Sequence, residues 1–138
     1  MADIEVRYVR GDRFLVEVRD HHIVVDQPRE SGGDDVGPTP TELFVAGLAA
    51  CVGFYAERFL LRHRLSAEGL KVGCDFDLST DRPARVGAID LRLTLPGDFP
   101  PERQAALLAV VEHCTVHNSL RVAPEVRVSI QEPESVAA

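Results

Sequence analysis

Apolar and polar positions alternate along the first part of the chain in a pattern typical of β-strands. The runs Ile4–Val9, Phe14–Val18 and His22–Asp26 alternate or are rich in β-branched residues, and Gly11-Asp12 marks a turn between the first two. The pattern predicts an N-terminal antiparallel meander.

A loop and a long helix are expected next. Residues 28–40 contain three glycines, three prolines and two aspartates, a composition typical of a loop. Thr39 offers a hydroxyl N-cap, Pro40 suits the first helical position, and Glu42 places an acid in the first turn. We expect a helix from there to about Arg64. Its first half is apolar nearly all round, which predicts a buried helix.

The remaining pattern completes an α+β layout. Alternation over Leu70–Leu78 and Ile89–Leu95 predicts two half-buried strands. A second helix is expected from Pro100, with apolar residues at helical spacing up to Cys114, and residues 126–130 predict a last strand. The predicted order is β-β-β-α-β-β-α-β around a long buried central helix.

Length and charge narrow the classes of function. A chain of 138 residues corresponds to a single domain, 1–138. A net charge of -7 without a run of Lys or Arg disfavours nucleic acid and anionic membrane surfaces as partners. Met1–Glu5 lacks the features of a signal peptide, and the longest apolar run, Leu43–Tyr55, is shorter than the roughly 20 residues of a membrane span. We therefore expect a cytoplasmic protein with reduced thiols.

The first two candidate thiols differ in their surroundings. Cys74 alternates in phase with Val72 and Phe76, which predicts a buried, inert cysteine. Cys51 lies in the long apolar helix, where it is either a core residue or a reactive thiol. Small neighbours at positions 47, 49, 50 and 53 would let another segment or a peroxide approach it.

Cys114 is flanked by His113 and His117. A cysteine is nucleophilic only as a thiolate, so a nearby cation must lower its pKa. The residues leave open an inert helix-end cysteine, a Cys/His metal site built on the two histidines, and a Cys–His hydrolase. No CxxC pair, nucleophile-elbow motif or cofactor motif occurs in the sequence, so neither a metal nor another cofactor is expected.

Two motifs together resemble the OsmC/Ohr family of osmotically inducible protein C and organic hydroperoxide resistance proteins. They are the Gly-Pro-Thr-Pro-x-Glu-Leu run at residues 37–43 that leads to Cys51, and the His-Cys-x-Val-His-x-Ser-Leu run at residues 113–120. The match covers essentially the whole chain in element order and length. The resemblance implies an intertwined homodimer with sites built from both chains.

The resemblance also implies a peroxidase that uses two thiols. By motif, Cys51 matches the cysteine that attacks the peroxide and becomes a sulfenic acid, and Cys114 matches the resolving cysteine. The resulting disulfide is reduced by a cellular dithiol.

Family members further use an arginine that stabilises the thiolate and a glutamate that holds the arginine. Arg13, beside the predicted turn, is our candidate for the arginine, with Arg19 and Arg29 as alternatives, and Glu42 is the candidate glutamate. In the best-characterised branches the glutamate stands one position earlier, where this chain has Thr41.

Apolar residues near the thiols are expected to bind the substrate. Leu43, Phe44 and Phe54 would favour alkyl hydroperoxides over hydrogen peroxide, and His117 would donate a hydrogen bond or add positive potential near Cys114. An alternative of a different class is a non-enzymatic dimer that binds a small apolar ligand in a pocket lined by helices. Replacing Cys51 with serine would abolish peroxidase activity but leave such ligand binding intact.

Overall fold

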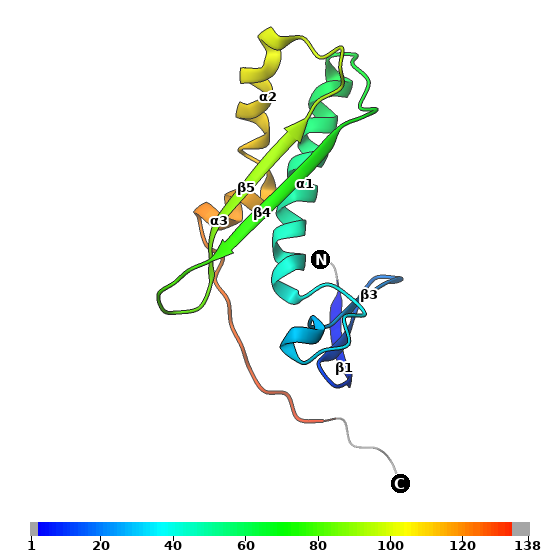
Figure 1. Cartoon of the computed structure of the whole chain (residues 1–138), viewed down its shortest axis with the longest axis vertical. Helices are drawn as coiled ribbons and strands as arrows, with labels where there is room; N and C mark the ends of the chain where they lie inside the picture. Colours follow the sequence, from blue (N-terminus) through cyan, green and yellow to red (C-terminus); the bar gives the residue numbers. More distant parts are fainter. Residues whose placement is uncertain (1–2, 134–138) are drawn as a thin grey trace.

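The computed structural model describes residues 3–133, in which a long central helix connects two small sheets (Figure 1). β1 (Ile4–Arg10), β2 (Arg13–Val18) and β3 (His21–Val25) form an antiparallel sheet in the order β1-β2-β3. Arg10 pairs with Arg13, which leaves Gly11 and Asp12 as the turn, and Gly11 adopts a positive φ of 53°. The predicted meander is confirmed.

The central helix, α1 (Pro40–Arg62), follows the predicted boundaries closely. Its buried residues recur at helical spacing and form the centre of the core, with Leu48, Val52, Ala56 and Leu60 on one stripe. The first half differs from the expectation of a buried helix, because Phe44 is exposed in the single chain, as are Phe54 and Leu61 in the second half. By length and composition α1 could also cross a membrane, a property that core helices of soluble proteins share.

The second sheet is a two-stranded hairpin that packs on α1. β4 (Lys71–Leu78) and β5 (Val86–Thr94) pair so that Val72 lies opposite Leu93 and Phe76 opposite Ile89. Val72, Ile89 and Leu93 pack against the core, whereas Asp75 and Arg92 form an ion pair of 2.6 Å on the exposed face. Both predicted strands are confirmed.

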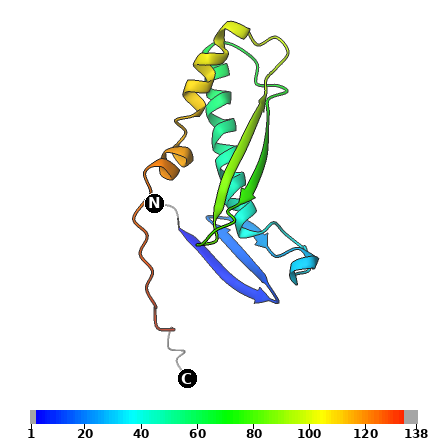
Figure 2. The ribbon, with the colours of Figure 1, turned by 60° about the vertical axis from the view of Figure 1, so that its left-hand side comes forward.

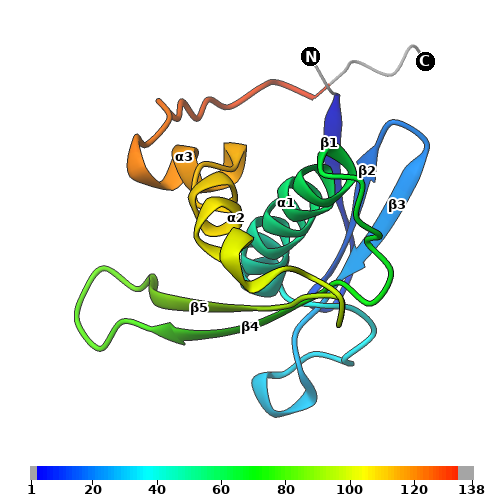
Figure 3. The ribbon, with the colours of Figure 1, turned by 90° about the horizontal axis from the view of Figure 1, so that it is seen from above.

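The second helical region consists of three pieces instead of the one predicted helix. A 3₁₀ turn, η2 (Pro101–Arg103), leads into α2 (Gln104–Val111), and α3 (Thr115–Arg121) follows after a short break. Seen along α1, both α1 and α2 lie over the same face of the β4–β5 hairpin (Figure 3). The helix breaks because Cys114 adopts an extended backbone conformation and caps α3.

The predicted last strand is not formed in the described part of the chain. Residues 122–133 are extended and run away from the helices (Figure 2), without a neighbouring strand to accept their hydrogen bonds. Val126, Val128 and Ile130 alternate as a strand would, yet they are 76%, 92% and 98% exposed. The α+β class is confirmed, and the order differs from the prediction at this element and at α3.

Candidate active site

The first motif fixes the point at which α1 begins. The Thr39 hydroxyl accepts a hydrogen bond from the Glu42 N–H (3.0 Å), and the Glu42 carboxylate accepts one from the Thr39 N–H (2.9 Å). This capping box, with Pro40 at the first helical position, satisfies N–H groups that would otherwise lack partners. The motif thereby sets the register of Cys51 three turns further along the helix.

The loop before α1 is closed onto β3 by a buried carboxylate. Asp26 is 2% exposed and accepts N–H groups from Gln27 (2.7 Å), Asp34 and Val36 (both 3.2 Å). Burial alone would raise the pKa of Asp26, but these three N–H donors and the charge of Arg13 outweigh burial and lower the pKa.

Gly37 of the same motif has a steric role in this closure. A β-carbon at Gly37 would collide with the Val24 carbonyl oxygen, so only glycine allows this close approach. After Gly37, the Pro38 carbonyl accepts a hydrogen bond from the Asp26 N–H (3.1 Å). Loop and motif together hold the start of α1 against β3.

Cys51 lies on the stripe of α1 that faces α2 and α3. It is partly exposed and packs against the core cluster that contains Leu48, Val52 and Cys114. Because Leu48 and Cys51 are one helical turn apart, the thiol is adjacent to the apolar surface that Leu48 contributes.

Cys114 is fully buried and begins α3. Its sulfur accepts a hydrogen bond from the His117 N–H at 3.3 Å, so the thiol serves as the N-cap of the helix. Burial raises the pKa of Cys114, and the N–H groups of His117 and Val116 offset this increase only in part. Interaction with the neighbouring Cys51 thiol raises the pKa of Cys114 further.

The fold thus brings together two thiols from elements 63 residues apart in sequence. The interaction between them adds to burial in favouring the protonated form of Cys114. Cys74 lies on β4, where burial and the charge of Asp75 raise its pKa and no other thiol contributes to the shift. Cys51 and Cys114 are therefore the pair on which redox chemistry would centre.

Leu48 and His117, each one helical turn from one of the two thiols, line an apolar groove. It has a volume of about 320 Å³ and lies between the first half of α1, β5 and α3. Phe44 and Leu48 line it on one side and His117 and Leu120 on the other, so two of the expected substrate-binding residues, Phe44 and His117, share one cavity. Its lining suits a hydrocarbon chain.

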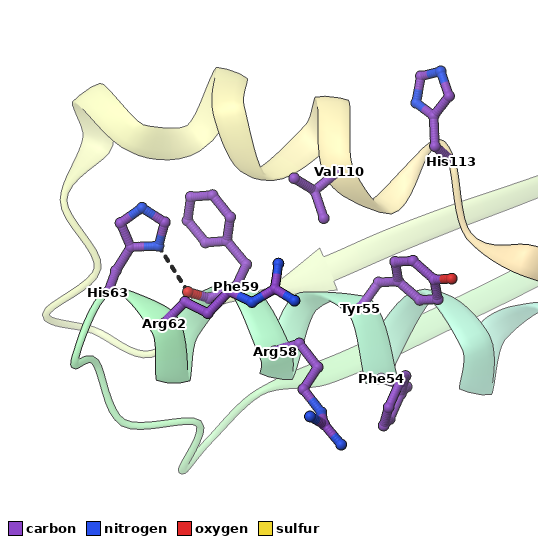
Figure 4. Close-up of a pocket in the computed structure, with 8 residues that line it drawn as sticks. All are labelled: Phe54, Tyr55, Arg58, Phe59, Arg62, His63, Val110 and His113. Carbon is purple, nitrogen blue, oxygen red and sulfur yellow. Dashed lines mark hydrogen bonds between the residues drawn. The ribbon is translucent and has the colours of Figure 1, made fainter.

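The other two expected substrate-binding residues are elsewhere. Phe54 lines a second groove of about 620 Å³ between α1 and α2, together with aromatic and basic side chains (Figure 4). Phe44 and Phe54 are ten residues apart on one helix, which separates them by about 15 Å along its axis. Leu43 is half-buried and lines neither groove.

Arg13 and Glu42 contact neither thiol within the described residues. The Arg13 guanidinium, at the start of β2, pairs with Asp34 at 3.2 Å, and its buried Nε has no hydrogen-bond partner among the described groups. Glu42 is occupied by the capping box. Their catalytic roles stay predictions, as do those of the alternatives Arg19 and Arg29.

Sequence reasoning missed one polar contact next to the thiols. The Tyr55 hydroxyl on α1 lies 2.9 Å from the Thr115 hydroxyl at the start of α3. In Figure 4 the Tyr55 ring extends from α1 toward the turn before α3, near His113. Tyr55 follows Cys51 by four residues and Thr115 follows Cys114 directly, but nothing in the sequence pairs the two hydroxyl groups.

The histidines near Cys114 are held in other ways. His113 Nδ1 is hydrogen-bonded to the Ala109 carbonyl (2.8 Å), while His117 faces the apolar groove. Among residues 3–133, no three His, Cys, Asp or Glu side chains are grouped as a metal ion would require.

Comparison with known proteins identifies relatives of this arrangement. A family model described as OsmC-like protein matches residues 32–129. A search of curated proteins gives no significant match.

Several solved structures share the fold. An OsmC-like protein from Mycoplasma pneumoniae aligns with a TM-score of 0.77 at 18% identity, covering 89% of each chain. An organic hydroperoxide resistance protein OsmC from Legionella pneumophila aligns with a TM-score of 0.68 at 24% identity, covering 88% of this chain and 89% of that one. The organic hydroperoxide resistance protein OhrB of Bacillus subtilis aligns with a TM-score of 0.66 at 21% identity, covering 89% and 92%.

Proposed function

Since the chain belongs to the OsmC-like family, we propose that it is a thiol-dependent peroxidase that reduces organic hydroperoxides. The observation that carries the proposal is that Cys51 packs against the core cluster that contains Cys114, with an apolar groove lined by residues one helical turn from each thiol. Relatives of the same fold from L. pneumophila and B. subtilis bear the name organic hydroperoxide resistance protein, which agrees with this chemistry.

Exposure divides the roles of the two thiols. Cys51 is partly exposed, whereas Cys114 is 0% exposed and its pKa is raised. A thiol that keeps its proton is a poor first nucleophile. We therefore assign the attack on the peroxide to Cys51 and the second step to Cys114.

The reaction proceeds in three balanced steps. The Cys51 thiolate attacks the hydroxyl oxygen of the hydroperoxide, the O–O bond breaks, and the alkoxide takes up a proton to leave as an alcohol. The Cys114 sulfur then attacks the sulfur of the Cys51 sulfenic acid, forming the S–S bond and releasing water. A cellular dithiol reduces this disulfide by exchange and is itself oxidised.

The groove beside the thiols would hold the organic part of the substrate. Phe44 and Leu48 offer apolar surface, and burying a hydrocarbon chain there contributes roughly 25 cal/mol per Å². Hydrogen peroxide gains nothing from this surface. His117 lines the same groove and would donate a hydrogen bond to the leaving oxygen.

We further propose that the active form is an intertwined cytoplasmic homodimer. β1 has an unpaired edge, and residues 126–130 have the alternation of a strand without a partner in the described chain. The buried Nε of Arg13 also lacks an acceptor among residues 3–133. A second copy would supply the missing strand contacts and would allow Arg13 to face a thiolate of its partner, with Glu42 nearby.

Mass spectrometry tests the peroxidase directly. One equivalent of cumene hydroperoxide should lower the mass of the reduced chain by about 2 Da through a Cys51–Cys114 crosslink. Cys74→Ser should react like the wild type, and Cys51→Ser should not react. An unchanged mass with three free thiols would contradict the proposal and favour the ligand-binding dimer.

A further inference from the structure

We propose that Tyr55 and Thr115 form a polar clamp that positions Cys114 for disulfide formation. This inference rests on the peroxidase proposed above and adds two positioning residues to it. Neither residue reacts, and each acts through the cysteine beside it.

The clamp repeats the geometry of the thiol pair one helical turn away. Cys51 and Tyr55 are four residues apart on α1 and so lie on the same side of that helix. Cys114 and Thr115 are consecutive residues at the start of α3. The Tyr55–Thr115 contact of 2.9 Å therefore joins α1 to the start of α3, next to the point where Cys51 packs against the core cluster that contains Cys114.

Few other contacts hold α3 in place. None of its seven residues, Thr115–Arg121, is fully buried, and its apolar contact with the core is limited to the partly buried Val116. Within the described chain, the Tyr55–Thr115 hydrogen bond is the sole side-chain hydrogen bond between α1 and α3. The position of the helix relative to α1 thus depends on this bond, on the partly buried Val116 and on the buried Cys114.

That position matters most in the second chemical step. A disulfide forms only when two sulfurs approach to about 2.05 Å with a restricted dihedral angle, which limits how far the backbones can separate. A clamp that holds the start of α3 against α1 raises the effective concentration of the Cys114 thiol at the Cys51 sulfenic acid. Attack of Cys51 on the peroxide needs no such approach.

Two reactions of the sulfenic acid compete, and their ratio reports on the clamp. The Cys114 thiol converts the sulfenic acid to a disulfide and releases water, whereas a second peroxide molecule oxidises it to a sulfinic acid and leaves as an alcohol. Slower disulfide closure shifts the products toward the sulfinic acid at a given peroxide concentration.

Tyr55→Phe removes the hydroxyl and keeps the ring that packs against the core. We expect the ratio of sulfinic acid to disulfide to rise about three- to fivefold, because the loss of one hydrogen bond changes a ratio of rates by about this factor. Mass spectrometry across a series of cumene hydroperoxide concentrations measures the ratio. Thr115→Val should have the same effect, and Thr115→Ser, which keeps a hydroxyl, should restore the wild-type ratio. Tyr8→Phe on the exposed β1 strand is the matched control, because Tyr8 and Tyr55 are the two tyrosines of the chain.

The rate of the first chemical step, the reaction of Cys51 with peroxide, provides a second measurement. In a Cys114→Ser background, the rate at which dimedone-trapped sulfenic acid forms on Cys51 should be equal with Tyr55 and with Phe at this position. An unchanged product ratio in Tyr55→Phe, with normal disulfide formation in the wild type, would overturn the clamp alone. Absence of any disulfide in the wild type would overturn the peroxidase and the clamp together.

Discussion

Cys114 combines a structural role with its proposed chemical role, and the structural role can be measured separately. Cys114→Ala removes the sulfur that accepts the His117 N–H at 3.3 Å, and loss of a side-chain N-cap costs about 1 kcal/mol. It also deletes one fully buried heavy atom from a packed core, which costs about 1 kcal/mol more, as in an Ile→Val change. The two effects together amount to about 2 kcal/mol, or a decrease in Tm of about 6–10 °C for a chain of this size.

Cys114→Ser separates the two contributions. The serine oxygen can still accept the His117 N–H, because serine is a preferred N-cap residue, so about half of the decrease should be recovered. Thermal unfolding followed by far-UV circular dichroism, with excess reductant and at one protein concentration, measures both variants. Cys74→Ala on β4 is the control, since it removes the same atom from a site that caps no helix.

The comparison of the two Cys114 variants decides the outcome. If Cys114→Ala and Cys114→Ser unfold at the same temperature, the sulfur does not cap α3 and the reasoning is refuted. If both unfold at the temperature of the wild type, the burial argument fails as well.

Three further changes test other parts of the structure. The pKa of Asp26 is lowered in the folded state, so the ionised carboxylate stabilises the fold above the ordinary Asp value of 3.8, and this stabilisation is lost as pH falls through the lowered pKa. Asp26→Asn should therefore decrease the midpoint of urea unfolding at pH 7 and make that midpoint depend less on pH in acid. Thr39→Ala should decrease the free energy of unfolding by about 1 kcal/mol in urea titrations, through loss of the capping box. Phe44→Ala should raise the KM for long-chain alkyl hydroperoxides and leave turnover of hydrogen peroxide unchanged in steady-state assays; an equal loss for both substrates would contradict the assignment of the groove.

Local signals in the sequence predicted most of the elements. The capping residues Thr39, Pro40 and Glu42 predicted the start of α1 correctly, because a capping box involves only neighbouring residues and can be recognised from their types. Alternation gave β1 to β5 for the same reason. The elements that differ depend on longer-range contacts.

Residues 126–130 illustrate an element that local pattern alone predicted wrongly. Their alternation is that of a strand, but a strand requires a neighbour, and the described chain provides none. The break before α3 was missed because a cysteine is an uncommon N-cap, and its sulfur replaces the hydroxyl or carboxylate that normally marks such a position.

The fold also brings together only some of the residues that the sequence predicted for the candidate site. Motif spacing singled out Cys51 and Cys114, and the fold packs Cys51 against the core cluster that contains Cys114. Phe44 and Phe54 were grouped because both are apolar and close in sequence, but helical rise carries them into different grooves. The partner of Tyr55 could not be identified from the sequence, since its hydroxyl meets a residue 60 positions away.

The loop before α1 has a consequence for how this protein tolerates change. Its closure uses backbone N–H groups and the single carboxylate of Asp26, so most side chains of the loop make no contribution to it. At Gly33 and Gly37 an added β-carbon would meet the carbonyl oxygens of Gln27 and Val24. Residues 29–31, an exposed 3₁₀ turn, lie between Asp26 and Gly33 and include no buried residue. A peptide tag or a fluorophore inserted there would leave the thiol-bearing helix where it is, which makes this turn the natural attachment point for reporters of the redox reaction.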